Sequence, residues 1–424
     1  MSSSALERRV KRWLLQAPFD VFVQVTPGLE GVLLGELADL GLAGSGGGAT
    51  AERGGEALAL DLDGVMRVNL ELRTAGRVML RLGSFPAATP EMLVGRARKL
   101  PWEVHLGFYE SYALRMSSRR SKLQGGGYLA KTVGAAIGRR MGEVGLAPRL
   151  ADDAPLAFHV RLQDDRCTLS LDTSGEHLHR RNVRRHVHAA PLRETLAAAV
   201  VLEGLAGMEG RPDVVVDPFC GSGTLLLEAV DLLSGLPPGR RRSFAFEEAA
   251  WHRPGRWREV RRRAGLDVGD GGVSSGGDGA ARVASGSAAT GPRAPAAPLP
   301  AVLGLDSDGD ALDASRLNLS HPEYRSVELR QRDSLSFDFD TLGASRGLIV
   351  ANLPYGVRLG ERQEADEIVS SFLRRLAGGR TRWRVALLSA NPGVVETRLR
   401  HARTLATSNG GLRVWLTTGE IGGA

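Results

Sequence analysis

The chain has 424 residues, which is more than one ordinary domain needs and enough for two or three domains with separate cores. Its hydrophobic content of 42% and charged content of 24% exclude an intrinsically disordered protein. The formal net charge of +7 favours a polyanionic partner, but the 51 arginines and four lysines are explained equally well by a GC-rich genome.

Short strands and helices are mixed in the N-terminal part of the chain. A strand over 21–26, a helix over 29–40 whose leucines share one face, and a return strand over 57–63 come first. From there to about residue 175 the sequence predicts, in order, a helix and strand over 69–85, a helix over 90–100, a strand over 111–121, a helix over 127–145 and a hairpin over 158–175 that turns at Asp164 and Asp165.

From Pro191 onward, strands alternate with helices. The strand segments are VVVDPF, AVLGLD, GLIVANL and WRVALLSA, and helical segments such as TLLLEAVDLL lie between them. This alternation predicts a mostly parallel, doubly wound sheet. Residues 267–300 are nearly all Gly, Ser, Ala, Thr and Pro, which predicts a flexible, mostly disordered insertion.

A glycine-rich turn follows the first strand of this alternating half. The strand ends at Asp217, and a helix is predicted to begin near Thr224. Gly221 and Gly223 allow the backbone to turn tightly where a ligand approaches, beside the unpaired N–H groups of the helix N-terminus. The turn lacks both the GK[ST] of a nucleoside triphosphate site and the G-x-G-x-x-G of dinucleotide enzymes. Cys220 lies inside the turn, so we do not expect it to act as a nucleophile.

Acidic residues end the next two strands. Asp306 ends AVLGLD and is suited to accept hydrogen bonds from ribose hydroxyls, as acids do in other nucleoside-binding α/β folds. Asp333 follows a further strand and could contact an adenine amino group. Each alone is more often an ordinary surface acid, but their order behind the glycine turn favours a nucleoside-containing cofactor.

The tetrapeptide Asn352–Tyr355 ends the strand GLIVANL. An exocyclic amino group on a base is a poor nucleophile because its lone pair is delocalised into the ring. The Asn352 side-chain oxygen and a carbonyl of Leu353–Pro354 could accept the two amine hydrogens, which would direct the lone pair toward an electrophilic methyl group. Pro354 stiffens the loop, and Tyr355 offers a face on which a flipped base can stack. An Asn-Pro turn with a packed tyrosine is the alternative.

These motifs together resemble a known family. The segments RLGSFPA, MSSRRSKL, VRLQDDRCTLSLDTSGEHLHRR, APLRETLAAAVVL, VDPFCGSGTLLLEA, FAFEEAAW and IVANLPYGVRLG follow one another as in the THUMP-domain RNA guanine-N2 methyltransferases. The resemblance is to the bacterial 23S rRNA enzymes of the RlmL type in particular, and it covers nearly the whole chain outside the insertion. The family usually has N-P-P-Y, and here Leu353 replaces the first proline while the backbone carbonyl is kept. Asp306 and Ser307 also depart from the family's D-x-D, although Asp308 restores an acid.

The resemblance implies an α/β fold in which an N-terminal α+β part, ferredoxin-like plus THUMP, precedes a Rossmann-like doubly wound methyltransferase domain. It implies a ferredoxin-like segment at 1–65, an RNA-binding THUMP domain at 66–175, a basic linker at 176–190 and the methyltransferase domain at 191–424. The implied cofactor is S-adenosyl-L-methionine, whose binding residues would be Asp217, Pro218, Gly221, Gly223, Thr224, Asp306 and Asp333. Asn352, Pro354 and Tyr355 would hold the target guanine, and methyl transfer would be direct, through positioning and polarisation of the amine.

Two basic clusters are candidates for binding RNA phosphates. The first is Arg119, Arg120 and Lys122, and the second is Arg180, Arg181, Arg184 and Arg185 in the run between the two halves. The second cluster could instead close over the cofactor or be a solvated linker.

Cysteine usage and apolar patterning favour a cytoplasmic protein. Cys167 and Cys220 lie far apart, which excludes a disulfide framework and a cysteine-rich zinc site, and we expect no metal. No stretch approaches the roughly 20 unbroken apolar residues of a membrane-spanning helix, so we expect no membrane association. The N-terminal residues also lack the pattern of a secretory signal.

Several functions fit these patterns. Structured RNA is the expected partner, rRNA ahead of tRNA, because the motifs identify the amine and not the RNA. A tRNA guanine-N2 methyltransferase of the same architecture stays open, as does a non-catalytic RNA-binding or ribosome assembly factor. A DNA adenine methyltransferase would share the amine motif but not the THUMP-like half.

Overall fold

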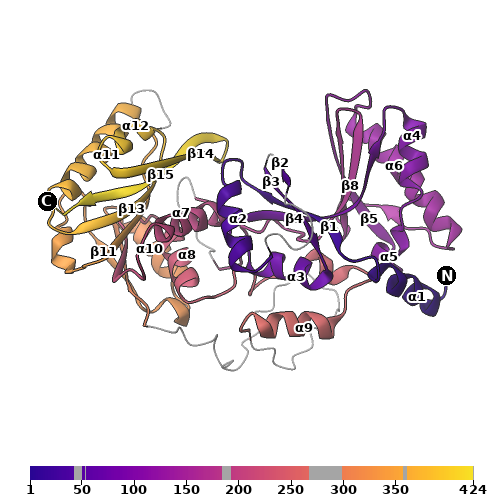
Figure 1. Cartoon of the computed structure of the whole chain (residues 1–424), viewed down its shortest axis with the longest axis horizontal. Coiled ribbons are helices and arrows are strands. Elements are labelled where there is room, and N and C mark those ends of the chain that lie inside the picture. Colours follow the sequence, from indigo (N-terminus) through magenta and orange to yellow (C-terminus); the bar gives the residue numbers. More distant parts are fainter. Residues whose placement is uncertain (43–49, 53, 184–191, 267–297, 357–360, 424) are drawn as a thin grey trace. The chain divides into compact units, whose positions relative to one another are not determined.

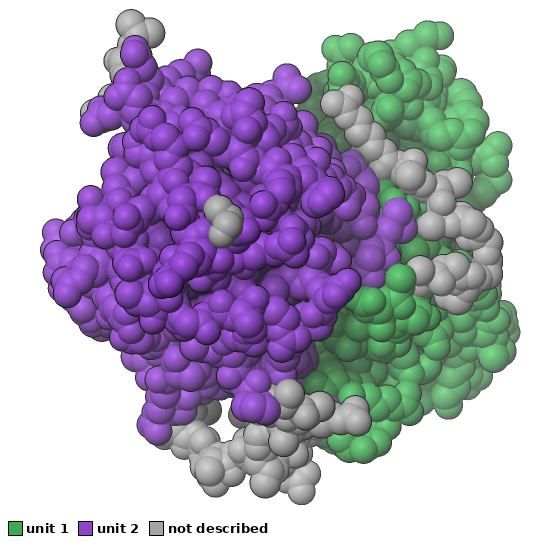
Figure 2. All heavy atoms as spheres, turned by 60° about the vertical axis from the view of Figure 1, so that its left-hand side comes forward, with its two compact units in different colours: residues 1–24, 37–178, 242–264 green, residues 25–36, 179–241, 265–424 purple. Residues whose placement is uncertain are grey.

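The computed structural model describes residues 1–42, 50–52, 54–183, 192–266, 298–356 and 361–423 (Figure 1). Its described residues form two compact units (Figure 2). Unit 1 comprises residues 1–24, 37–178 and 242–264, and unit 2 comprises residues 25–36, 179–241 and 265–424. The predicted insertion at 267–300 lies almost wholly outside the described residues.

Unit 1 is built on an eight-stranded mixed sheet in the order β2-β3-β1-β4-β8-β7-β5-β6. Its strands are β1 (Phe19–Val25), β2 (Thr50–Glu52), β3 (Gly55–Leu60), β4 (Ala75–Pro86), β5 (Ser111–Arg119), β6 (Arg149–Leu150), β7 (Ala157–Gln163) and β8 (Arg166–Asp172). The helices of unit 1 are α1 (Ser3–Leu14), α3 (Leu62–Glu71), α4 (Pro90–Ala97), α5 (Trp102–Leu106), α6 (Gly126–Glu143) and α9 (Pro254–Arg263). Helix α2 (Glu30–Asp39) has most of its residues in unit 2 and its last three in unit 1.

The predicted hairpin is present as β7 and β8. Asp164 and Asp165 connect the two strands with φ values of 51° and 58°. Two consecutive left-handed residues give the type I′ geometry that matches the twist of paired strands, and Asp tolerates that region better than most residues. The hairpin therefore has its turn where the sequence predicted it.

Unit 2 is a doubly wound sheet of seven strands in the order β11-β10-β9-β12-β13-β15-β14. Its strands are β9 (Val214–Asp217), β10 (Ala301–Asp306), β11 (Val327–Gln331), β12 (Gly347–Asn352), β13 (Arg382–Ser389), β14 (Arg400–Asn409) and β15 (Leu412–Gly422). Its helices are α7 (Glu194–Ala206), α8 (Thr224–Leu233), α10 (Gly309–Asn318), α11 (Glu361–Ala377) and α12 (Pro392–Glu396). Short 3-10 turns occur at Ala245–Glu248 in unit 1, and at Pro322–Tyr324 and Phe339–Leu342 in unit 2.

Strand direction decides where this sheet can bind a ligand. β9 to β13 are mutually parallel wherever they pair, and β15 runs antiparallel to β13. The carboxyl ends of the five parallel strands therefore meet at one edge, where open α/β sheets bind their ligands. The strand order reverses at β9, so the crevice is expected beside the end of that strand.

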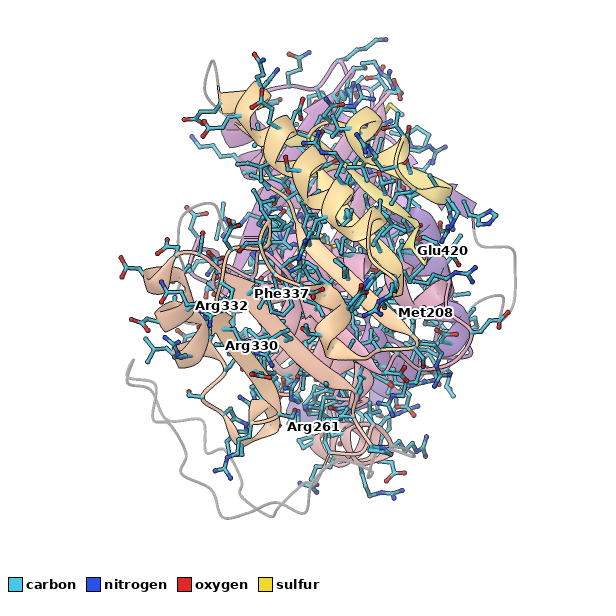
Figure 3. All side chains as sticks on the ribbon, turned by 90° about the vertical axis from the view of Figure 1, so that its left-hand side faces the viewer. Met208, Arg261, Arg330, Arg332, Phe337 and Glu420 are labelled. Atoms are coloured by element: carbon cyan, nitrogen blue, oxygen red, sulfur yellow. The ribbon has the colours of Figure 1, made fainter. Side chains whose placement is uncertain are left out.

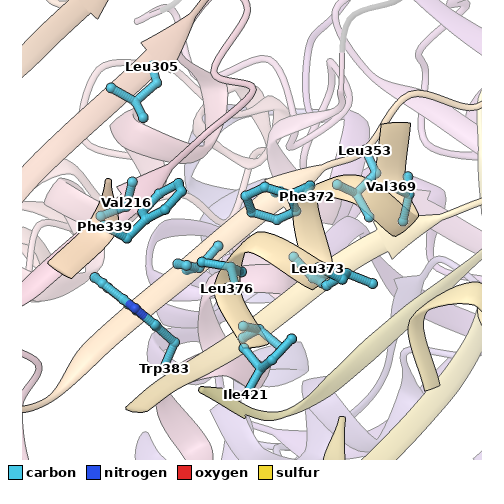
Figure 4. Close-up of a cluster of buried hydrophobic side chains, with 14 of the residues drawn as sticks. Val216, Leu305, Phe339, Leu353, Val369, Phe372, Leu373, Leu376, Trp383 and Ile421 are labelled. Carbon is cyan, nitrogen blue, oxygen red and sulfur yellow. The ribbon is translucent and has the colours of Figure 1, made fainter. Parts of the chain in front are cut away.

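A hydrophobic cluster between the sheet and α11 fixes the strands that carry this edge (Figure 4). It includes Val216, Ile349, Phe372 and Trp383, each at most 2% exposed. Only glycine fits at position 347 in β12, because a Cβ there would lie 2.2 Å from the Trp383 ring. The ends of β9 and β12 thus project from a packed layer, which holds the residues that follow them in place.

Candidate active site

The glycine-rich turn connects β9 to α8 in unit 2. Gly221 and Gly223 have φ values of 51° and 82°, a region that favours glycine. Gly223 is the N-cap of α8 and provides no side-chain cap, so the first N–H groups of the helix are not capped from that position. A Cβ at Gly221 would meet no atom within 4 Å, which leaves space beside the turn. The turn thus leaves room for a ligand to approach its backbone closely at Gly221.

Neighbouring elements fix the shape of this turn. The Cys220 N–H donates to the Leu305 carbonyl of β10 at 2.9 Å. The Ser315 hydroxyl donates to the Gly221 carbonyl at 2.6 Å, and the Asn318 amide donates to the Ser222 carbonyl at 3.0 Å. Sequence reasoning missed Ser315 and Asn318, although their i, i+3 spacing on α10 places two polar groups on one helical face.

Asp217 ends β9 as a buried carboxylate with 1% exposure. Its Oδ1 accepts a hydrogen bond from the Phe219 N–H at 3.1 Å. Desolvation, aided by the negative charge of Asp306, raises the pKa of the Asp217 carboxyl well above its usual range. Burial also raises the pKa of the Cys220 thiol, so the thiol is not activated as a nucleophile.

Asp306 lies at the end of β10 and contacts the glycine turn directly. Its Oδ2 accepts from the Gly221 N–H at 2.8 Å, and its Oδ1 accepts from the Asp308 N–H at 3.0 Å. The structure thus brings Asp217, the turn and Asp306 together, as the sequence order suggested.

Asp333 follows β11, one strand further from β9. It is exposed, and its Oδ1 accepts from the Leu335 N–H at 2.9 Å, which closes a tight turn. The hydroxyl of Ser334 donates to the Pro218 carbonyl, which ties this turn to the glycine turn. Arg330 in β11 and Arg332 just after it carry their side chains in this region (Figure 3). The Asp333 turn is therefore linked to the glycine turn through Ser334 and not through the Asp333 carboxylate.

Asn352 is the last residue of β12, on the other side of β9 from β10. The Tyr355 hydroxyl donates a hydrogen bond to Asn352 Oδ1. A carbonyl oxygen can accept two hydrogen bonds, so this contact uses one acceptor position of Oδ1 and leaves the other available. The Asn409 amide lies 3.5 Å from the Tyr355 hydroxyl. Sequence reasoning expected only the ring of Tyr355 to contribute, and the hydroxyl is a second contribution.

Leu353 occupies the position of the first proline in the N-P-P-Y pattern described above. Its side chain is 1% exposed and belongs to the hydrophobic cluster shown in Figure 4. Its N–H donates to the Leu388 carbonyl at 3.0 Å, a bond that proline could not make. The side chain at this position packs inward and leaves the backbone as the part of the residue that could contact a ligand.

The predicted basic clusters have different environments. Arg119, Arg120 and Lys122 are exposed at the end of β5, and the Arg120 guanidinium makes two bonds to Asp164 at 2.8 and 3.0 Å. Arg180 is exposed. Arg181 is instead buried, with its side chain and that of Glu228 each 3% exposed, and the two form an ion pair. Arg181 therefore anchors its segment to α8 and does not present its charge to solvent. Arg184 and Arg185 lie outside the described residues.

The described residues contain no group of three or more His, Cys, Asp and Glu side chains that could hold a metal ion. No helix in the described ranges is long and apolar enough to cross a membrane.

Together, the strand order, the antiparallel seventh strand and the two motifs at the carboxyl edge define a Rossmann-like methyltransferase domain. The chain belongs to the family described as RMKL-like, methyltransferase domain, whose model matches residues 181–410. A second model, the RlmL ferredoxin-like domain, matches residues 20–79.

Known proteins resemble the chain over most of its length. Ribosomal RNA large subunit methyltransferase K/L of Syntrophotalea carbinolica is 30% identical over 399 residues, which are 90% of this chain and 50% of that protein. Its namesake in Methylococcus capsulatus is 32% identical over 381 residues, 88% of this chain and 47% of that protein. The chain thus spans about half the length of the curated relatives it matches. The crystal structure of SMU.472 complexed with SAH superposes with a TM-score of 0.76 at 25% identity, covering 96% of this chain and 98% of that one.

Proposed function

We propose that this protein transfers a methyl group from S-adenosylmethionine to the exocyclic N2 amino group of a guanine in 23S rRNA. The observation that carries the proposal is the amide of Asn352, held by the Tyr355 hydroxyl with one acceptor position left, at the sheet edge that also carries the glycine turn. The names of the relatives support a ribosomal RNA substrate, and the SAH in the SMU.472 structure supports the cofactor.

The residues at the carboxyl edge fit S-adenosylmethionine. Within the described part of the chain no cationic side chain pairs with the buried Asp217, so a carboxylate is available for the amino group of the methionine end. Gly221, Gly223 and Thr224 present backbone at the N-terminus of α8, and Pro218 precedes them in the turn. We assign Asp306 to the ribose and Asp333 to the adenine. When bound, the cofactor supplies an electrophilic methyl group.

The chain's own contribution to the reaction is to orient the amine. Asn352 Oδ1 accepts one amine hydrogen, and the backbone carbonyl of Leu353, next to Pro354, accepts the other. This arrangement turns the nitrogen lone pair toward the incoming methyl group and stabilises the positive charge that develops on nitrogen. The Tyr355 hydroxyl keeps Oδ1, and not the NH₂ of the amide, directed at the substrate.

We further propose that exposed basic residues bind the phosphates of the RNA. The exposed residues Arg119 and Lys122 at the end of β5 are offered as phosphate contacts, with Arg120 shared between Asp164 and RNA and Arg180 as a further contact. We assign 1–65 to the ferredoxin-like segment, 66–175 to a THUMP domain, 176–190 to the linker and 191–424 to the methyltransferase domain. The enzyme would act in the cytoplasm, where ribosomal RNA is found.

Labelling tests the proposed function directly. The purified protein is incubated with S-adenosylmethionine carrying a radioactive methyl group and, in separate reactions, with undermethylated rRNA or tRNA, and the labelled nucleoside is identified after digestion. We expect N2-methylguanosine from 23S rRNA alone. Label in tRNA alone would keep the chemistry and overturn the substrate, whereas SAH binding without any label would favour the non-catalytic RNA-binding factor.

Cofactor affinity is expected to depend on pH through Asp217. Burial raises the pKa of this carboxyl, so in the free protein it gains a proton at a higher pH than an ordinary aspartate. A cationic ligand requires the ionised form, so binding releases a proton and affinity rises with pH. Below the raised pKa, affinity for SAH should fall roughly tenfold for each pH unit. Calorimetric titration in two buffers with different ionisation enthalpies measures both the affinity and the proton release.

The matched control for this titration is Asp217→Asn, which keeps the shape of the side chain but cannot ionise. We expect it to bind SAH weakly and without proton release. Proton release that persists unchanged in Asp217→Asn would show that another group titrates.

A further inference from the structure

A cavity of about 410 Å³ lies beside the Asn352–Tyr355 tetrapeptide in unit 2. Its walls come from the tetrapeptide end, from α11, from the segment after β13 and from the start of β15. The lining residues used below are Tyr355, Asp366, Asn391, Arg413 and Trp415.

Strand register places this cavity at the catalytic edge of the sheet. Trp415 pairs with Ser389, the last residue of β13, and Asn391 follows two residues later. Asn352 pairs with Leu388 on the same strand, so the cavity and the amide that orients the amine lie at the ends of adjacent strands. A base whose amino group reaches Asn352 would therefore have this cavity available for the rest of its ring.

Two aromatic side chains line the cavity. Tyr355 supplies one, and Trp415 supplies the other from β15. The Arg413 guanidinium lies over the Trp415 ring, 5.0 Å from its centroid, and restricts the movement of that ring. Extruded bases are commonly held by stacking on aromatic side chains of this kind.

One carboxylate in the cavity, that of Asp366, accepts a hydrogen bond from a neighbouring amide. The Asn391 Nδ2 donates to Asp366 Oδ2 at 2.8 Å. This contact occupies one carboxylate oxygen and leaves Oδ1 as an acceptor, and a carboxylate offers only acceptors. Guanine carries a hydrogen on N1 next to its N2 amino group, whereas adenine has a bare N1 that would face the carboxylate lone pairs.

We propose that this cavity holds the target guanine and that Asp366 accepts its N1–H, so that Asp366 selects guanine among the bases. The inference rests on the proposed function and adds the residue that reads the base. Asn391 is the positioning residue, because it keeps Asp366 Oδ1 directed at the ring. Asn352 then acts on the amino group, and Asp366 on the neighbouring ring nitrogen.

The test compares two RNA substrates in each preparation. The guanosine methylated by the unmodified protein is mapped first, and a short RNA is then synthesised with either guanine or 2-aminopurine at that position. 2-Aminopurine keeps the amino group but has a bare N1. In Asp366→Asn, the Asn391 amide is expected to donate to the oxygen of the new side chain. The new NH₂ group then faces the base and can donate to the bare N1 of 2-aminopurine.

We expect the ratio of kcat/KM for guanine to kcat/KM for 2-aminopurine to fall at least about tenfold in Asp366→Asn. The neighbouring exposed substitution Glu367→Gln on α11 should leave the ratio unchanged. Because both substrates are measured with the same protein, the ratio does not depend on how much of the variant is folded. An unchanged ratio in Asp366→Asn would overturn the inference and leave the proposed function standing. No methylation by the unmodified protein would instead overturn the proposed function.

Discussion

Replacing Asn352 with alanine is expected to lower kcat for methyl transfer by on the order of 10²–10³-fold, the usual cost of removing one preorganised group from a transition state. The variant loses the acceptor that orients the amine, while the glycine turn and Asp217 are untouched. Affinity for SAH should therefore stay within about twofold of the parent. Single-turnover rates with labelled cofactor measure the chemical step, and calorimetry measures cofactor binding.

One further substitution separates the two contributions of Tyr355. Tyr355→Phe keeps the ring for stacking but removes the hydroxyl that donates to Asn352 Oδ1. We expect a smaller loss in kcat than for Asn352→Ala, on the order of tenfold, with little change in KM. If Asn352→Ala retained near-parental kcat on rRNA, the assignment of the amine-orienting role to this residue would be wrong.

Glu228→Gln is expected to destabilise unit 2 by about 3–5 kcal/mol, because it removes the carboxylate that pairs with the buried Arg181 guanidinium. Both side chains are 3% exposed, so water cannot replace the lost contact. Denaturant unfolding followed by fluorescence should show a lower midpoint with little change in the slope.

The double substitution Arg181→Met with Glu228→Leu provides the matched comparison. It removes both charges and replaces them with apolar side chains of similar length, so most of the lost stability should return. Asp313→Asn serves as a surface control, because it breaks an exposed pair with Arg316 on α10 and should leave the midpoint within error. Equal losses in Glu228→Gln and Asp313→Asn would show that the buried pair has no special role.

Much of the fold could be predicted because burial leaves a period in the sequence. The strands β9, β10, β12 and β13 are short apolar runs followed by turn residues, and each lies where its run predicted it. The turn of the hairpin β7–β8 was predicted from its two aspartates, because Asp tolerates the left-handed conformation that such a turn requires. The parallel direction of these strands followed from their alternation with helices, which favours a sheet with its ligand edge at the carboxyl ends.

The remaining features depend on contacts between residues far apart in sequence. A basic run gives no indication of which arginine turns inward, and Arg181 is buried because Glu228, 47 positions later, faces it. Likewise, the cavity beside Tyr355 combines α11 with the start of β15, and neither segment carries a recognisable motif. The Tyr355 hydroxyl contact required coordinates, since the tetrapeptide alone suggests only a ring.

The backbone and the side chain of Leu353 meet different requirements. Its carbonyl is the part assigned to chemistry, and every amino acid provides a carbonyl. Its side chain packs in the hydrophobic cluster behind β12, where the available volume limits its size. Substitutions at this site should therefore follow the volume that neighbours such as Val369 leave open, while a proline here would also lose the N–H bond to the Leu388 carbonyl.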